Sequence, residues 1–209
     1  YVDLIVMRHS LEGAARLASE VASVPIINGG DGSNQHPTQC LLDLYSIKKT
    51  QGTLDNLDIA LVGDLKYGRT IHSLAIAMSN FNTTFHLVSP ESLKLLSSVK
   101  MYIKERNLKY YQYTEIQDAV DKVDILYMSR VQRERFLDIQ DYEKVKNSCI
   151  LDKSLLANVK SSMKVLHPLP RVNEININVD STPYAYYFQQ AKNGVFVRQA
   201  LIALILGLK

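Results

Sequence analysis

Short apolar runs and amphipathic segments alternate along this chain. The apolar run 59–62 has the length and the β-branched content of a buried strand. A loop punctuated by Gly63 and Gly68 follows it. Beyond the loop, apolar residues recur at the i, i+3, i+4, i+7 spacing of an amphipathic helix: Ile71, Leu74, Ala75 and Met78. Strand, glycine loop and helix in this order form half of a βαβ unit, and such units bind ligands where the strand ends.

The same alternation predicts an α/β fold for most of the chain. Further strands are expected at 2–7, 24–28, 84–88, 108–113 and 125–128, with a last strand that ends at 165–166. Helices are expected at 11–21, 37–49, 91–106 and 115–123, and the polar segment 29–34 is expected to form a turn outside any regular element. Helices that alternate with short strands predict a parallel sheet with helices on both faces.

The segment 195–208 follows once the pattern of strands is complete. It is apolar almost all round, so we expect it to lie in a core, and it is too short to span a bilayer. Two interpretations are open. The segment either returns to a first domain that includes residues 1 to about 35, or it caps the same sheet as a peripheral helix.

Composition narrows the classes of function. The 209 residues are 46% apolar and 22% charged, which is typical of a globular protein. The net charge of +3 without a Lys/Arg run argues against a nucleic-acid partner, and we find neither a signal peptide nor an apolar run long enough for a membrane. Cys40 and Cys149 make no disulfide framework, so we expect a reducing compartment, the cytoplasm. Because the chain starts at Tyr1 directly in an apolar run, we interpret it as part of a longer protein.

Two arginines stand where ligands would bind. Arg69 falls in the first turn of a helix, where a cation is unfavourable unless an anion lies between it and the free N–H groups. Arg8 directly follows the first strand and could clamp a phosphate. The alternatives are a solvated side chain for Arg69 and an ion pair with Glu12 for Arg8.

His36 precedes a helix that Pro37 opens. The free N–H groups of that helix would lower the pKa of the imidazole and keep it neutral, so that it could donate one hydrogen bond to a carbonyl or phosphoryl oxygen. Gln39 adds an amide in the same turn. The alternative is that His36 merely caps the helix.

Two further segments follow strands. Arg130 and Gln132 lie in a basic loop whose charge requires Glu134, another carboxylate or a bound dianion to offset it, unless the loop is simply solvated. In 167–171, His-Pro-Leu-Pro-Arg, two prolines predict an extended backbone whose Leu169 carbonyl could accept a hydrogen bond from a ligand. A structural turn is the alternative there.

The sequence offers no site for a metal or a cofactor. The five histidines lack zinc spacing, and neither cysteine has a partner two residues away. The segment 63–68 does not match the dinucleotide fingerprint, and no Gly-Lys-Ser/Thr loop is present. Several arginines, one histidine and two amides at strand ends therefore predict a pair of acidic ligands, such as a phosphate and a dicarboxylate.

These motifs resemble those of a known family. The segment 36–39, His-Pro-Thr-Gln, resembles the carbamoyl-phosphate signature of carbamoyltransferases. In order and spacing, the segments 62–70, 130–132, 167–171, 182–190 and 196–200 are similar to the catalytic chains of aspartate transcarbamoylases. The match covers essentially all of the chain. The ornithine-specific members carry His-Cys-Leu-Pro and a Ser-Met-Gly loop, which this chain lacks, so the aspartate branch is favoured.

The resemblance implies transfer of a carbamoyl group from carbamoyl phosphate to the amine of L-aspartate, a step of pyrimidine biosynthesis, without a metal or a cofactor. It implies that carbamoyl phosphate is held by Arg8, His36, Gln39 and the backbone of Leu169 and Pro170, with Arg8 and His36 polarising the carbonyl oxygen. It further implies that Arg69 and Arg130 bind the two carboxylates of aspartate with support from Gln132.

The resemblance also implies an organisation. Residues 1–35 would be the C-terminal piece of a carbamoyl-phosphate domain, 36–193 the aspartate domain, and 194–209 a helix that returns to the first domain. Family members form trimers with shared active sites, and regulatory chains or fused pathway domains are compatible with that arrangement. The family's Ser-Thr-Arg-Thr motif and the Ser/Lys loop of the neighbouring subunit are absent, so we expect this chain alone to lack full activity. An ornithine carbamoyltransferase and a non-catalytic homologue are the alternatives.

Overall fold

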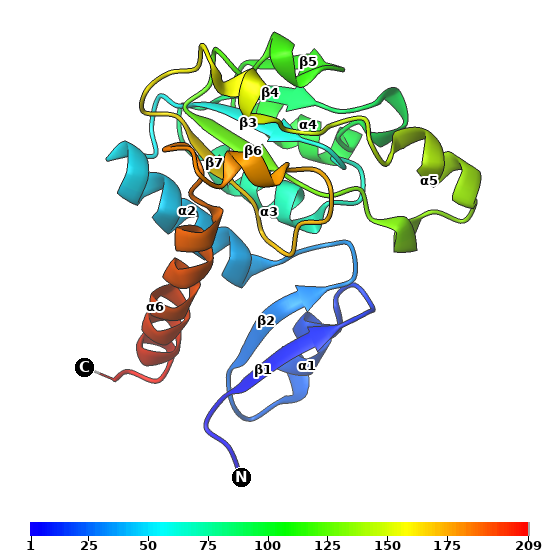
Figure 1. Ribbon diagram of the computed structural model, residues 1–209. Coiled ribbons are helices and arrows are strands. Elements are labelled where there is room, and N and C mark those ends of the chain that lie inside the picture. The colour runs from blue at the N-terminus through cyan, green and yellow to red at the C-terminus, as the bar shows by residue number, and fades with distance from the viewer. Residues whose placement is uncertain (209) are drawn as a thin grey trace.

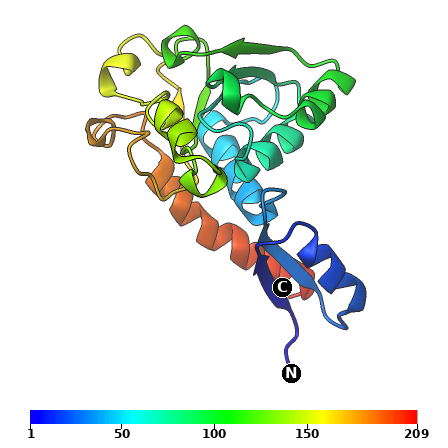
Figure 2. The same cartoon turned by 90° about the vertical axis from the view of Figure 1, so that its right-hand side faces the viewer.

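A computed structural model describes residues 1–208 as two lobes of unequal size (Figure 1). The larger lobe surrounds a five-stranded sheet. The smaller is a β–α–β unit formed by the first 31 residues. Helices α2 and α6 run along one side of the larger lobe, and α6 ends level with the small unit (Figures 1 and 2).

The strands are β1 (Ile5–His9), β2 (Ile26–Asp31), β3 (Asp58–Val62), β4 (Thr84–Val88), β5 (Tyr110–Tyr113), β6 (Ile125–Met128) and β7 (Lys164–Leu166). The helices are α1 (Ala14–Val21), α2 (Pro37–Gln51), α3 (Arg69–Met78), α4 (Ser97–Glu105), α5 (Ile139–Val145) and α6 (Tyr187–Ile205). Both sheets are parallel throughout, which confirms the predicted α/β class.

The order of strands in the large sheet is β5-β4-β3-β6-β7. The chain therefore builds outward from β3 in one direction through β4 and β5, then returns to the other side of β3 for β6 and β7. Such a reversal leaves a crevice at the carboxyl ends of the two central strands, here β3 and β6, because their connections leave toward opposite faces. The topology alone thus marks one place on the sheet for a ligand.

Both faces of the sheet are covered. Ile59 and Leu61 point into a core shared with α2, α3 and α4, while Ala60 and Val62 point into a second core on the opposite face. That second core is covered mainly by connecting segments and 3-10 turns, at 116–118, 153–156 and 177–179, and by the first turn of α6. Burial on both faces explains why β3 reads as a continuous apolar run.

We had predicted that the segment 29–34 forms a turn outside any regular element, and this prediction is wrong for its first three residues. Gly29, Gly30 and Asp31 belong to β2. Gly30 has φ +123°, a conformation that side chains rarely adopt, and a Cβ there would lie 3.0 Å from the Arg69 guanidinium carbon. The glycines therefore serve a close approach at the end of a strand instead of ending it.

Several helix boundaries also differ from the expectation. The helix expected at 91–106 is a 3-10 turn followed by α4, because the Leu93 carbonyl accepts a hydrogen bond from the Leu65 N–H (3.1 Å) instead of continuing a helix. The helix expected at 115–123 is only a 3-10 turn, and α5 was not predicted. Helix α6 begins at Tyr187, well before residue 195, since its first turns bury polar residues that an apolar pattern does not reveal.

Within residues 1–208 the outer half of α6 is not enclosed, so its return to the core of a first domain stays a prediction. Val195, Phe196 and Leu204 are 55%, 53% and 79% exposed. The helix packs against α2 on one side and leaves these side chains on the surface. Among residues 1–208, we find no helix with the length and hydropathy needed to cross a membrane.

Gly63 directly follows β3 and lies close against the segment that follows β6. Its φ is +105°, and a Cβ there would lie 2.2 Å from the Ser129 carbonyl oxygen. We therefore expect Gly63→Ala to lower the free energy of unfolding by about 1–3 kcal/mol, because the segment after β6 must move. Urea denaturation measures the change.

Gly52→Ala is the matched control for this substitution. Gly52 also has a positive φ (+75°), but a Cβ there would meet no atom within 4 Å. It isolates the cost of the backbone conformation. Equal losses of stability in the two variants would contradict a role for close contact at Gly63.

Candidate active site

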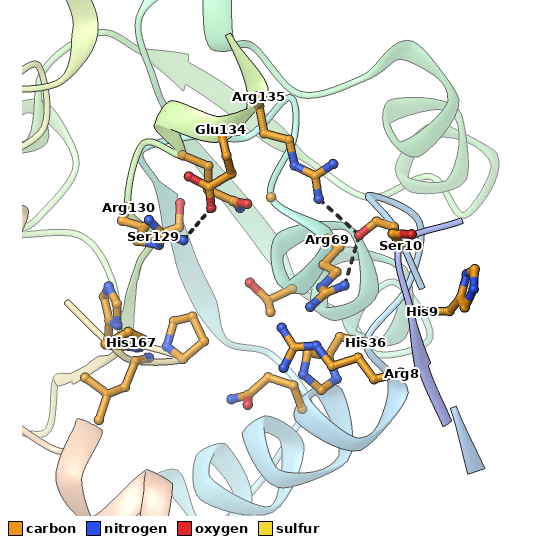
Figure 3. A pocket seen from close by; sticks show the side chains of 18 residues that line it. Arg8, His9, Ser10, His36, Arg69, Ser129, Arg130, Glu134, Arg135 and His167 are labelled. Atoms are coloured by element: carbon orange, nitrogen blue, oxygen red, sulfur yellow. Dashed lines mark hydrogen bonds and ion pairs between the residues drawn. The ribbon is translucent and has the colours of Figure 1, made fainter. Parts of the chain in front are cut away.

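A cleft of about 560 Å³ opens at the crevice between β3 and β6. It is lined by every residue that the sequence singled out for binding: Arg8, His36, Gln39, Arg69, Arg130, Gln132, Leu169 and Pro170. Figure 3 shows side chains from both lobes converging on this space. The structure brings these residues together, although they span 163 positions of sequence from Arg8 to Pro170, counted inclusively.

Element ends position these groups. Arg8 lies on β1, near its carboxyl end, and His36 is the residue that precedes α2. Arg69 is the first residue of α3. Gln39 lies in the first turn of α2, and the remaining groups follow β6 and β7. Since parallel strands present their carboxyl ends at one edge, a sequence of this pattern gathers its loops there.

His36 does not cap its helix through its side chain. Its backbone N–H donates to Ser73 Oγ (3.0 Å), and among residues 1–208 its buried Nδ1 has no hydrogen-bond partner. Burial, and then the charges of Arg69, Arg8 and Arg198, lower the pKa of His36 to about 4. The ring is therefore neutral near pH 7, as we expected, but burial contributes most to the shift.

Arg69 and Arg135 share one backbone acceptor. Arg69 Nη1 donates to the Gly32 carbonyl oxygen (2.9 Å), and Arg135 Nη2 donates to the same oxygen (3.2 Å; Figure 3). Burial, followed by the charges of Arg8 and Arg135, lowers the pKa of Arg69. A carbonyl cannot neutralise two guanidinium groups, so the cluster keeps a surplus of positive charge.

No carboxylate within residues 1–208 forms an ion pair with Arg8, Arg69 or Arg135. The alternative of an Arg8–Glu12 pair is therefore not found. Like charges held together without a directly paired carboxylate favour a bound anion. The cleft is thus suited to ligands with several negative charges.

Arg130 has a carboxylate partner. Its Nη2 lies 2.7 Å from Glu134 Oε1, and both side chains are partly exposed. This is the offset by Glu134 that the sequence had left as one option. An exposed pair of this kind holds its partner weakly, so a ligand carboxylate can compete for the guanidinium.

Gln39 is buried, and Asp43, which lies on the side away from the cleft, orients its amide. Its Nε2 donates to Asp43 Oδ1 (2.9 Å), which leaves its Oε1 as the amide atom available to a ligand donor. Asp43 is fully buried. Burial raises the pKa of Asp43 to about 7, although hydrogen bonds from Gln190, Tyr127 and Gln39 oppose the rise.

The segment 167–170 is not extended throughout, contrary to our prediction. Leu169 has φ +52°, and the Leu169–Pro170 peptide bond is cis. The Leu169 N–H donates to His167 Nδ1 (2.8 Å), so the ring turns the backbone and carries its proton on Nε2, which lies 2.7 Å from Glu174 Oε1. Burial acts in the opposite direction, but the hydrogen bond from His167 holds the pKa of Glu174 below its usual value.

The sequence interpretation missed other residues of the cleft. Thr70, Ser129 and Arg135 also line it, as does Glu134, which we had named only as a partner for the loop charge. The position of Ser129 directly after β6 was a usable signal. Nothing in the local pattern around Arg135 indicated that it would reach Gly32. Within residues 1–208, no group of three or more His, Cys, Asp or Glu side chains is arranged to hold a metal ion.

The low pKa of His36 predicts a pH dependence of stability. With an ordinary pKa of 6.5, the unfolded chain binds more protons than the folded chain between pH 6.5 and about 4. The free energy of unfolding contributed by this group therefore falls as the pH is lowered through that window. We expect His36→Gln to lose less stability than the native chain between pH 7.5 and 5, measured by urea denaturation at each pH. His9→Gln, at an exposed position, is the control; the native pH dependence in His36→Gln would contradict the prediction.

Comparison with known families agrees with this geometry. The model described as "Aspartate/ornithine carbamoyltransferase, Asp/Orn binding domain" matches residues 55–205, and the corresponding "carbamoyl-P binding domain" model matches residues 1–49. A relative from Bacteroides fragilis, "Aspartate carbamoyltransferase catalytic subunit", is 62% identical over all of this chain and 68% of the relative. A protein of the same name from Bacteroides thetaiotaomicron is 59% identical over all of this chain and 67% of that protein.

Solved structures give the same result. The catalytic subunit of M. jannaschii aspartate transcarbamoylase superposes with a TM-score of 0.91 at 48% identity, over 99% of this chain and 67% of that one. Aspartate transcarbamoylase from Trypanosoma cruzi in complex with carbamoyl phosphate and aspartate also gives 0.91, at 36% identity, over 97% of this chain and 66% of that one. The family model matches residues 55–205, which is most of this chain, and the relative from Bacteroides fragilis is 62% identical to it. This chain therefore belongs to the aspartate/ornithine carbamoyltransferase family.

Proposed function

We propose that this chain transfers the carbamoyl group of carbamoyl phosphate to the amine of L-aspartate and so forms N-carbamoyl-L-aspartate and phosphate. One observation carries the proposal: Arg8 on β1, Arg69 at the start of α3 and Arg130 in the loop after β6 line one cleft with the neutral His36. The names of the most similar relatives support aspartate as the acceptor. Formation of carbamoyl-aspartate supplies a step of pyrimidine biosynthesis.

In this proposal the carbamoyl phosphate site uses both kinds of hydrogen-bonding group. The guanidinium of Arg8 and the N–H of neutral His36 donate to the carbonyl oxygen. The amide of the same ligand donates to Gln39 Oε1, which Asp43 leaves available, and to the backbone of Leu169 and Pro170. A ligand with one acceptor and one donor on the same carbon fits this arrangement.

The aspartate site uses the other two arginines. Arg69 and Arg130 bind the two carboxylates, with Gln132 in support, because a guanidinium presents paired donors that match a carboxylate. Arg69 has no carboxylate ion pair within residues 1–208, and Arg130 has only the partly exposed Glu134. Both guanidinium groups therefore keep donors for a ligand.

The chemistry follows from juxtaposition. The aspartate amine attacks the carbamoyl carbon, and Arg8 and His36 stabilise the negative charge on the carbonyl oxygen of the tetrahedral intermediate. The C–O bond to phosphate then breaks, and phosphate leaves with the bonding electron pair and takes up the proton of the amine. No covalent enzyme intermediate and no cofactor is needed.

The proposal includes an organisation for the chain. Residues 1–35 and 194–209 belong to the carbamoyl-phosphate domain, and 36–193 form the aspartate domain, consistent with a small β1–α1–β2 unit that stands apart from the large sheet. We propose a homotrimer with shared sites, to which regulatory chains or fused domains could attach. Buried free thiols at Cys40 and Cys149 suit the cytoplasm.

The acceptor tests the proposal directly. We expect the protein at its natural length to form product from aspartate and not from ornithine. Arg130→Ala should reduce kcat/KM for aspartate, by an amount that corresponds to a loss of about 2–5 kcal/mol of transition-state stabilisation. The affinity for carbamoyl phosphate should change little. Steady-state kinetics and calorimetry measure the two quantities.

Arg133→Ala is the control for that variant, because Arg133 lies in the same loop but is exposed. It should leave both quantities near the native values. A preference for ornithine would overturn the proposed acceptor. Equal losses for both ligands in Arg130→Ala would remove Arg130 from the aspartate site.

His36→Ala tests the proposed donor to the carbonyl oxygen. Removing one such donor should lower kcat by about 10²–10³ while aspartate binding changes little. His9→Ala serves as the control, since the exposed His9 ring points away from the group in Figure 3. An unchanged kcat in His36→Ala would exclude His36 from the mechanism.

A further inference from the structure

A buried carboxylate lies behind the cleft, in the middle of α2. Asp43 is fully buried and accepts three hydrogen bonds. Gln39 Nε2 (2.9 Å) and Gln190 Nε2 (2.6 Å) donate to its Oδ1, and the Tyr127 hydroxyl donates to its Oδ2 (2.8 Å). The donors come from α2, α6 and β6, so one side chain connects three elements.

This carboxylate determines which way two amides face. Both glutamines donate to the same oxygen, Oδ1, which accepts whether the group is ionised or carries a proton on Oδ2, so both turn their NH2 groups toward Asp43 and their carbonyl oxygens away from it. In Gln39 the oxygen that remains, Oε1, belongs to a residue that lines the cleft. In Gln190 the oxygen accepts the backbone N–H of His167 (2.8 Å).

The second contact reaches the opposite wall of the cleft. His167 begins the segment 167–170, and its ring in turn accepts the N–H of Leu169 (2.8 Å). The backbone of Leu169 and Pro170 is therefore fixed through Gln190 and His167 to Asp43. One carboxylate orients an acceptor in α2 and the backbone that follows β7.

We infer that Asp43 is the positioning residue that gives the cleft its acceptor character toward the NH2 of the carbamoyl ligand. Asp43 itself touches no ligand in this arrangement and acts through Gln39 and Gln190. Through these two glutamines, Asp43 makes the cleft prefer a ligand that carries the carbamoyl NH2 over a ligand with a group of similar size that cannot donate a hydrogen bond. This inference rests on the proposed function and adds the origin of its donor specificity.

Acetyl phosphate is the matched probe, because a methyl group replaces the NH2 and offers no donor. We measure the dissociation constants of carbamoyl phosphate and acetyl phosphate by calorimetry, on the protein at its natural length. In Asp43→Leu, Gln39 and Gln190 lose the partner that orients them. The preference for carbamoyl phosphate should fall by about five- to tenfold, the value of one or two net hydrogen bonds.

Asp43→Asn is the conservative comparison. Asparagine keeps one oxygen that can accept from both glutamines, and its NH2 can donate to the Tyr127 hydroxyl. It should therefore retain the native preference, whereas a role that depends on the negative charge alone would be lost equally in both variants. A preference that falls as far in Asp43→Asn as in Asp43→Leu would overturn the inference.

Ser46→Ala controls for the packing of α2 on α6. Ser46 Oγ accepts from Asn193 across the same interface (3.0 Å), so its removal weakens that interface without touching Gln39 or Gln190. It should keep the preference. If Asp43→Leu binds both ligands more weakly but in the native ratio, Asp43 is only structural.

Gln190→Leu keeps the test decisive if Asp43→Leu does not fold, as judged by circular dichroism. It removes the support of the His167 segment alone and should give part of the loss of preference. A native ratio in Gln190→Leu would then overturn the inference. Absence of carbamoyl phosphate binding, or of carbamoyl-aspartate formation, in the native protein would instead contradict the proposed function.

Discussion

The structure depends on how positive charge is tolerated at the carboxyl end of the sheet. Three guanidinium groups, those of Arg8, Arg69 and Arg135, line one cleft with His36, and the charges of Arg8 and Arg135 both act on Arg69. Hydrogen bonds to a backbone carbonyl hold two of them without cancelling their charge. The folded chain therefore keeps like charges close together in the cleft, where they repel one another, and the surrounding contacts must hold them there.

The support is built from strand ends and buried polar contacts. The tight junction of Gly63 with Ser129 fixes the crevice between the central strands. Behind the crevice, the network around Asp43 joins α2, α6 and the segment after β7. The first fixes the place of the site, and the second fixes the direction in which its polar groups face.

The sequence predicted the fold class and central strands such as β4 and β6 well, because buried parallel strands are short apolar runs with clear ends, but it ended β1 and β2 too early, at residues 7 and 28. It failed where tertiary contacts compete with local patterns. The Leu93 carbonyl pairs with Leu65 and stops a helix, and the buried Gln190 and Asn193 conceal the start of α6. The motif-bearing members of the cleft were predictable from their places at strand ends. Arg135 was not, since only folding brings it to Gly32.

The carbonyl oxygen of Gly32 has a consequence beyond the cleft itself. It belongs to the turn after β2 in the small unit, whereas the two guanidinium groups that bind it extend from α3 and from the loop after β6. The same two guanidinium groups that attract an acidic ligand therefore also form hydrogen bonds between the lobes. A ligand that draws either guanidinium away from this oxygen therefore removes a contact between the lobes as it binds between them.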